Sequence, residues 1–184
     1  GPDYKFGWGR VNAHRAYKLM TAKNYLTDSV SHFNNKNHNI VVPSGVSQVR
    51  VMVYWSDHEA TANANKALVN NLDIKITNPS SQQFLPWTLD PTPVISLLDK
   101  DAVRGVDTLN NMEQVTIDNP AAGTYVLNIF GTTVPQGPQQ YYVVYEFVTN
   151  NITVTYPSGG ESFEPNTTET IRWDAYGTTG TFTL

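Results

Sequence analysis

Acidic and amide side chains gather at two places in the 184-residue sequence, each beside a segment of alternating apolar residues. The first cluster holds Asp57, Glu59, Asn71 and Asp73. Calcium binds six to eight oxygen atoms from carboxylates, amides and backbone carbonyls, so acids and amides at the ends of adjoining strands suit it. Asn and Asp are also ordinary turn formers that tie loops through backbone hydrogen bonds. The pattern leaves both interpretations open.

The second cluster spans residues 107–113 and adds Asp107, Asn111 and Glu113 as candidate metal ligands. It precedes another strand-like segment, where either an ion or hydrogen bonds from side chains to the backbone would order the loop. We favour the hydrogen-bonding interpretation for this cluster. Structural calcium is the one cofactor that the sequence suggests.

No catalytic constellation can be assembled from the sequence. A nucleophilic hydrolase presents Ser or Cys on a tight glycine-flanked turn beside a base, and we find no such segment. The four histidines are expected to be solvated, because none has the paired spacing of a metal site; they are His14, His32, His38 and His58. We therefore predict no catalytic residue in this chain.

The composition predicts a globular fold and argues against two classes of partner. Hydrophobic residues make up 40% of the chain and aromatic residues 11%, enough for a sizeable core. A net charge of −4 with 12 scattered Lys and Arg provides no basic stripe for nucleic acid. Membrane insertion is not expected, because no run of 18 apolar residues occurs. The absence of Cys leaves the compartment open.

Hydrophobic periodicity predicts one helix followed by β-strands. Apolar residues recur at helical spacing over residues 11–20, whereas residues 49–55 and 68–77 alternate with a period of two. Further strands are expected at 114–117, 125–129 and 141–147, and two short ones at 152–154 and 170–173. The pattern predicts a mainly β protein with an antiparallel jelly-roll β-sandwich.

Several segments resemble a known protease family. Residues 1–13, Gly-Pro-Asp-Tyr-Lys-Phe-Gly-Trp-Gly-Arg-Val-Asn-Ala, look like the last helix of a subtilisin-family catalytic domain, where Gly-x-Gly-x-(Val/Ile)-Asn-Ala follows the serine-bearing helix. The segments 53–57, 68–74, 110–115 and 120–125 resemble the C-terminal jelly roll of large bacterial subtilases, which is similar to the P domain of proprotein convertases. Where that family often has Asn-Asp-Leu-Asp, residues 70–73 read Asn-Asn-Leu-Asp, with one carboxylate fewer.

The C-terminal segment resembles the start of Ig-like modules found in bacterial secreted enzymes. It contains a Pro-x-Gly-Gly-Glu turn at 157–161 and a Thr-x-x-Ile-x-Trp strand at 168–173. An immunoglobulin-type sandwich needs about 100 residues, so we expect a truncated module here.

The resemblance implies three parts and a parent enzyme. Residues 1–30 correspond to the last catalytic-domain helix and a linker, 31–149 to the jelly roll and 150–184 to the Ig-like module. The parent would be a secreted or cell-surface bacterial serine endopeptidase that cleaves protein substrates, with its triad outside this chain. The jelly roll would pack on that catalytic domain and stabilise it, with structural calcium as an aid. We expect the helix to expose an apolar face and to support a dimer.

An alternative function is an extracellular module that binds polysaccharide or protein. Aromatic rings on a flat sandwich face would support it, because rings stack on sugars and add interface area. Trp87, Tyr142 and Tyr145 are the available rings. A jelly roll buries most such rings, so the accessory domain is our preferred hypothesis.

Overall fold

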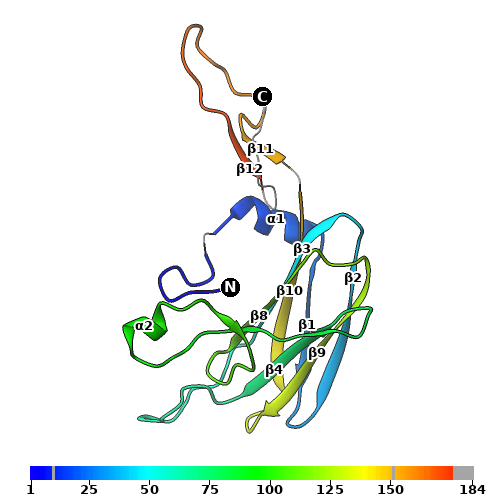
Figure 1. Cartoon of the computed structure of the whole chain (residues 1–184), viewed down its shortest axis with the longest axis vertical. Coiled ribbons are helices and arrows are strands. Elements are labelled where there is room, and N and C mark those ends of the chain that lie inside the picture. The colour runs from blue at the N-terminus through cyan, green and yellow to red at the C-terminus, as the bar shows by residue number, and fades with distance from the viewer. Residues whose placement is uncertain (10, 151, 176–184) are drawn as a thin grey trace.

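The computed structural model describes residues 1–9, 11–150 and 152–175, and its main regular structure is antiparallel β-sheet (Figure 1). The elements in chain order are α1 (Ala13–Thr21), β1 (Tyr25–Val30), β2 (Asn35–Val42), β3 (Val46–Tyr54), β4 (Asn71–Thr77), β5 (Gln83–Phe84), β6 (Trp87–Thr88), α2 (Ile95–Leu98), β7 (Val103–Arg104), β8 (Met112–Asp118), β9 (Gly123–Thr133), β10 (Gln139–Thr149), β11 (Ile152–Tyr156) and β12 (Arg172–Ala175).

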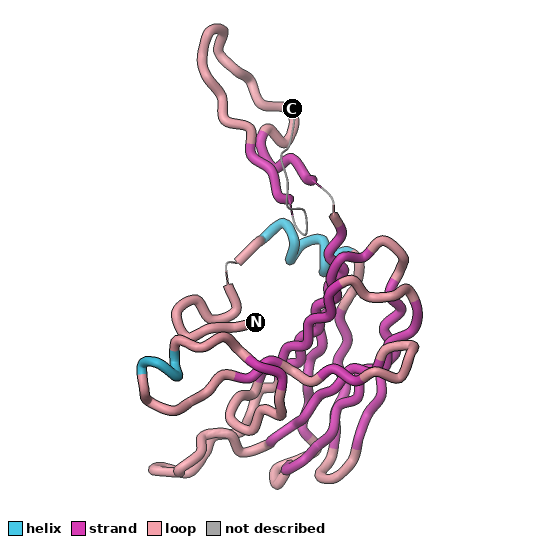
Figure 2. The backbone as a smooth tube through the Cα atoms, viewed as in Figure 1, coloured by secondary structure: helices cyan, strands magenta, loops and turns pink. Residues whose placement is uncertain are grey.

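Two four-stranded antiparallel sheets pack face to face. We call them sheet 1, with strand order β1-β10-β3-β8, and sheet 2, with strand order β2-β9-β4-β5. The short β6–β7 ribbon and α2 form an insertion between β5 and β8 (Figure 2). With this insertion set aside, the strand order is that of an eight-stranded jelly roll: consecutive strands lie in opposite sheets, except β4 and β5, which pair in sheet 2. The predicted fold class is confirmed.

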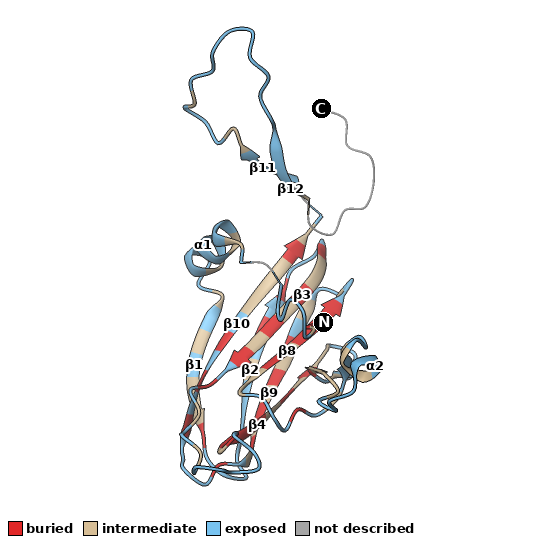
Figure 3. Ribbon diagram, turned by 90° about the vertical axis from the view of Figure 1, so that its left-hand side faces the viewer, coloured by how far each residue is buried: buried red, intermediate tan, exposed pale blue. Residues whose placement is uncertain are grey.

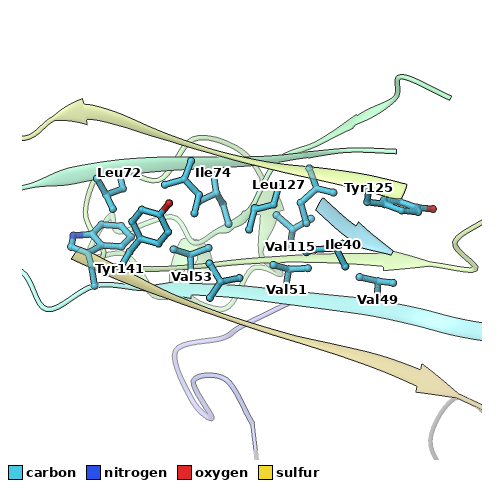
Figure 4. Close-up of a cluster of buried hydrophobic side chains, with 14 of the residues drawn as sticks. Ile40, Val49, Val51, Val53, Leu72, Ile74, Val115, Tyr125, Leu127 and Tyr141 are labelled. Atoms are coloured by element: carbon cyan, nitrogen blue, oxygen red, sulfur yellow. The ribbon is translucent and has the colours of Figure 1, made fainter. Parts of the chain in front are cut away.

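The core lies between the two sheets and follows the predicted alternation. Val49, Val51 and Val53 of β3 face inward and meet Leu72 and Ile74 of β4 from the other sheet (Figure 4). Leu127 and Tyr125 of β9 and Tyr141 of β10 fill the same layer. Alternate residues of a strand point to opposite faces, so the outer faces of both sheets are left to polar and partly exposed side chains.

Residues 25–30, expected to belong to a linker, form the edge strand β1 of sheet 1. Tyr25 lies opposite Val144, and Val30 lies opposite Gln139 on β10. The sequence signal is weak because an edge strand exposes much of its length, and three consecutive polar residues, Thr27 to Ser29, interrupt the apolar alternation. Thr27 Oγ1 donates a hydrogen bond to the Tyr141 carbonyl at 2.9 Å, which ties this edge to β10.

Helix α1 lies at one end of the sandwich and buries none of its residues (Figure 3). The Asn12 side chain caps its N-terminus by accepting a hydrogen bond from the Arg15 N–H at 3.0 Å. The Arg15 guanidinium forms a two-pronged ion pair with Glu146 of β10, with Nε to Oε1 at 2.6 Å. A polar contact therefore holds the helix to the sheet. Tyr17 and Met20 remain 66% and 65% exposed.

Strands β11 and β12 form a hairpin that projects from the sandwich (Figure 1). In the turn that follows β11, the Glu161 carboxylate accepts hydrogen bonds from the Ser158 N–H at 2.6 Å and the Gly159 N–H at 2.7 Å. Backbone and hydroxyl hydrogen bonds from Ser158, with a smaller contribution from Gly159, lower the pKa of Glu161 to about 2. Residues 176–184 of the predicted C-terminal module lie outside the described residues.

Candidate functional site

Glu113 sits in an unusual environment at the start of β8. Its side chain is completely buried, on the same face as the core residues Val115 and Ile117. Oε2 accepts a hydrogen bond from the Ile74 N–H at 3.0 Å, on a part of β4 that β5 does not cover. Oε1 has no hydrogen-bond partner among the described residues. Burial raises the pKa of Glu113 well above its usual value; the Ile74 hydrogen bond opposes this shift, and the nearby charges of Asp73 and Asp107 add to it.

Asn71 and Asp73 each have one more buried side-chain oxygen without a hydrogen-bond partner among the described residues. They lie two residues apart on β4, so they share the face opposite Leu72 and Ile74. A bulge in β9 opposite this point turns the Thr132 hydroxyl toward Asp73, and Thr132 Oγ1 donates to Asp73 Oδ2. Within the described ranges, Asn71 Oδ1 and Asp73 Oδ1 are buried without a hydrogen-bond partner.

Asn71, Asp73 and Glu113 therefore each have one buried side-chain oxygen without a donor among the described residues, and all three residues were predicted as metal ligands. A buried acceptor without a partner costs about 1–3 kcal/mol, so such atoms call for a proton, a water molecule or a cation. Residues 1–9, 11–150 and 152–175 contain no group of three or more His, Asp or Glu placed to hold a metal ion. A cation here would depend on two carboxylates, an amide and further oxygen ligands from the backbone or water.

Other predicted ligands tie loops through hydrogen bonds. The Asp57 carboxylate accepts from the N–H groups of Val69 and Asn70 at 2.7 and 2.8 Å, closing the long connection between β3 and β4. Asp107 Oδ1 accepts from the N–H groups of residues 109 and 110 at 2.8 and 3.1 Å. Asn111 Nδ2 donates to the Trp55 carbonyl at 2.8 Å. These contacts match the hydrogen-bonding interpretation.

Glu59, the last predicted ligand, is exposed in the connection after β3. Asn70, which was not singled out, is completely buried: its Nδ2 donates to the Gln136 carbonyl at 2.8 Å and to Gln139 Oε1 at 2.7 Å. These bonds lock the loop before β10. The first cluster thus divides into a loop-tying part at Asp57 and an unsatisfied part at Asn71 and Asp73.

A groove of about 570 Å³ covers the outer face of sheet 2, and Asp73 and Glu113 lie on its wall. Its floor comes from side chains of β2, β9 and β4, and its other wall from Gln83, Leu85, Pro86 and Val106. The sequence pattern did not point to these floor residues, which are Asn35, Asn37, Lys75, Thr77, Val126, Asn128 and Phe130. The available signal was the repeat of Asn at 35, 37 and 39, which places three amides on one face of a strand.

The aromatic rings proposed as a binding platform differ in their environments. Trp87 Nε1 donates to Thr116 Oγ1 at 2.9 Å, and the Arg104 guanidinium lies 3.6 Å above the Trp87 ring. Tyr145 packs on Phe147 with ring centroids 5.6 Å apart. Tyr142 on β10 is 45% exposed. Internal packing thus occupies two of these three rings.

Tyr142 belongs to an apolar surface that α1 shares with sheet 1. We define the helix–sheet surface by the residues lining this hollow, which are Leu19, Met20, Tyr25, Leu26, Thr27, Tyr142, Val143 and Val144. Tyr25 is 54% exposed and Val144 is 36% exposed, beside the exposed Met20. Contiguous apolar surface of this kind marks interaction sites on soluble proteins. Neither helix in the described part of the chain is long and apolar enough to cross a membrane.

Comparison with known proteins links the sequence to a protease-related protein. No family model matches the sequence. The chain is 35% identical over 91 residues to the serine protease/ABC transporter B family protein tagB of Dictyostelium discoideum; the match covers 50% of this chain and 5% of that protein. A crystal structure of a protein from Sulfurospirillum deleyianum aligns with a TM-score of 0.35 and 7% identity over 70% of this chain and 99% of its own. Half of this chain is therefore similar to a small part of a protein named as a serine protease.

Proposed function

We propose that this chain is a non-catalytic accessory domain of a secreted or cell-surface, subtilisin-like serine endopeptidase, and that it docks on the catalytic domain. The helix–sheet surface is the observation that carries this proposal. A nine-residue helix is marginal by itself in water, yet no residue of α1 is fully buried on the sandwich. A partner covering Tyr17, Met20 and the adjoining Tyr25 would remove its exposed apolar area from water.

The helix–sheet surface suits a protein partner better than a nucleic acid. The surface is apolar and continuous across α1, β1 and β10, and the chain has a net charge of −4. Protein interfaces are centred on apolar and aromatic side chains such as Met20, Tyr25 and Tyr142. The similarity to a protein named as a serine protease supports a protease domain as the occupant.

We further propose that Asn71, Asp73 and Glu113 hold a structural calcium ion. Their unpartnered oxygen atoms are of the hard, partly anionic kind that calcium prefers. The ion would supply positive charge to two carboxylates that otherwise repel each other. Calcium binding would favour the ionised form of Glu113, which burial disfavours by raising its pKa. An ion that binds only the folded state would stabilise the domain by mass action.

Docking is tested with this chain and the separately expressed catalytic domain of its parent protein, by titration calorimetry. Met20→Asp places a charge on the helix–sheet surface and should weaken the complex at least tenfold, since burying an unpaired charge is costly. Val41→Asp is the matched control, because Val41 is 67% exposed on β2 of the other sheet.

The proposal fails if the parent protein has no protease domain, if no complex forms, or if both variants bind equally well. Sedimentation of the chain alone tests whether this surface instead mediates self-association. A dimer that Met20→Asp abolishes, without binding to the catalytic domain, would reassign the surface to self-association.

A further inference from the structure

The groove on the outer face of sheet 2 has an ordered floor that the docking surface does not use. Strand register arranges its side chains in cross-strand rows. The first row contains Asn35, Phe130 and Asp73; the second contains Asn37, Asn128 and Lys75; the third contains Val126 and Thr77. The floor thus combines amide side chains on β2 and β9 with one aromatic ring on β9 and with one acid and one base on β4. We propose that this groove binds a neutral oligosaccharide.

Hydrogen-bonding groups in the groove are held in place but not saturated. Asn128 Nδ2 donates to Asn37 Oδ1 at 2.7 Å, which fixes both amide planes and leaves each amide with unused capacity. Across the described part of the chain, the side chains of Asn35 and Lys75 have no hydrogen bond or ion pair. Sugar hydroxyls both donate and accept, so paired amides can serve each hydroxyl in both roles.

Glu113 provides an independent sign that the groove is built for a ligand. Its side chain is fully buried and lines the groove, yet Oε1 has no partner in the ranges that the structure describes. A carboxyl group that only linked the sheets would need Oε2 alone, which accepts from the Ile74 N–H. Oε1 therefore lacks a hydrogen-bond donor, as does Oδ1 of Asp73, which lines the same groove.

The charge and shape of the groove favour a sugar over other ligands. Asp73 and Lys75 carry opposite charges, so a highly charged ligand such as a polyphosphate would meet no cluster of cations. Phe130 lies on the middle strand of the first row, is partly exposed and lines the groove, so it supplies an aromatic ring for contact with a sugar. Small-ligand sites combine such apolar contacts with a few placed polar groups.

The test uses the whole chain and four soluble neutral polysaccharides: xylan, mannan, hydroxyethylcellulose and starch. Native gels containing each polymer, run in EDTA, should show retardation by at least one polymer. Titration with the hexasaccharide of that polymer should then shift amide resonances of β2, β9 and β4. Phe130→Ala should weaken binding about tenfold, and Asn128→Ala severalfold. Tyr142→Ala is the matched control, since it removes an exposed ring from sheet 1 and should change nothing.

Three results would overturn the inference: no retardation by any polymer, equal affinity of Phe130→Ala and the natural chain, or loss of affinity in Tyr142→Ala. Melting temperatures show whether each variant keeps its fold. If Phe130→Ala is unstable, the affinity of Asn128→Ala is used in its place. The inference does not rest on docking or on calcium. Met20→Asp should leave sugar binding unchanged, because its surface lies on α1 and sheet 1, and EDTA removes the ion from the assay.

Discussion

Replacing Glu113 by Gln should have opposite effects on stability with and without calcium. In EDTA at pH 7.5, the natural chain must either keep a buried carboxylate with an unpartnered oxygen or take up a proton. Gln has nearly the same volume, carries no charge, can still accept from the Ile74 N–H and adds an N–H donor beside Asp73. We expect a gain of about 2 kcal/mol, the middle of the range for a buried acceptor without a donor. For a chain of this size that gain raises the melting temperature by about 4 to 8 °C.

In calcium, the order of the two proteins should reverse. A site with a dissociation constant of ~10 µM would stabilise the natural chain by roughly 2.7 kcal/mol at 1 mM calcium, or about 5 to 11 °C. Glu113→Gln should lose nearly all of that shift because it removes a charged ligand. Glu59→Gln is the control, since Glu59 is an exposed acid for which we expect no change in either buffer. Calorimetry of the three proteins in both buffers measures the result.

The pH dependence in EDTA provides a second reading of the same residue. Because the pKa of Glu113 is higher in the folded chain than its ordinary value of 4.5, the folded state binds this proton more tightly than the unfolded state. Its contribution to stability is therefore greatest at and below pH 4.5 and is lost as pH rises toward the folded pKa. Glu113→Gln should remove this slope. If Glu113→Gln is less stable than the natural chain in EDTA, the reasoning is refuted. If calcium raises the melting temperature of both proteins equally, Glu113 is not a calcium ligand.

Three further predictions concern positions outside the groove. Asp57→Ala should cost about 1–3 kcal/mol in urea unfolding, because two N–H groups at residues 69–70 lose their acceptor, and should leave the calcium shift unchanged. Leu72→Ala should cost about 2–5 kcal/mol in the same assay, since the removed side chain is completely buried in the core. The pKa of Glu161 is lowered to about 2, so the turn is intact above the unfolded value of 4.5 and should loosen as pH falls through about 2, a change that the Ser158 amide shift would report.

The sandwich could be predicted from the sequence because its central strands alternate cleanly. Val49, Val51 and Val53 occupy one face of β3, and the same period places Leu72 and Ile74 in the core. The edge strand β1 could not be recognised, because an edge strand is only partly covered and need not alternate strictly between apolar and polar residues. The centre of β1 is polar. The exposed apolar residues of α1 followed from helical spacing, but whether the helix packs on the sheet did not.

The candidate site was predictable only in part, because sequence shows which strand a residue occupies but not which strands meet. Asn71, Asp73 and Glu113 were proposed individually from acid and amide content. Asp73 and Glu113 line the same groove because β8 is an edge strand of sheet 1 and β5 leaves part of β4 uncovered in sheet 2, where Glu113 reaches the Ile74 N–H. The groove needed the register of three strands from distant parts of the chain, and no local pattern contains that information.

The jelly roll explains how one small domain can present two unlike surfaces. Its stability comes from the inner faces of both sheets, so the outer faces are free to differ. On sheet 1, β1 and β10 place Tyr25 opposite Val144, and the surface is apolar. On sheet 2, β2 and β9 place Asn37 opposite Asn128, and the surface is rich in amides. Because the core separates the two faces, a protein docked on sheet 1 would leave the groove on sheet 2 open to its own ligand.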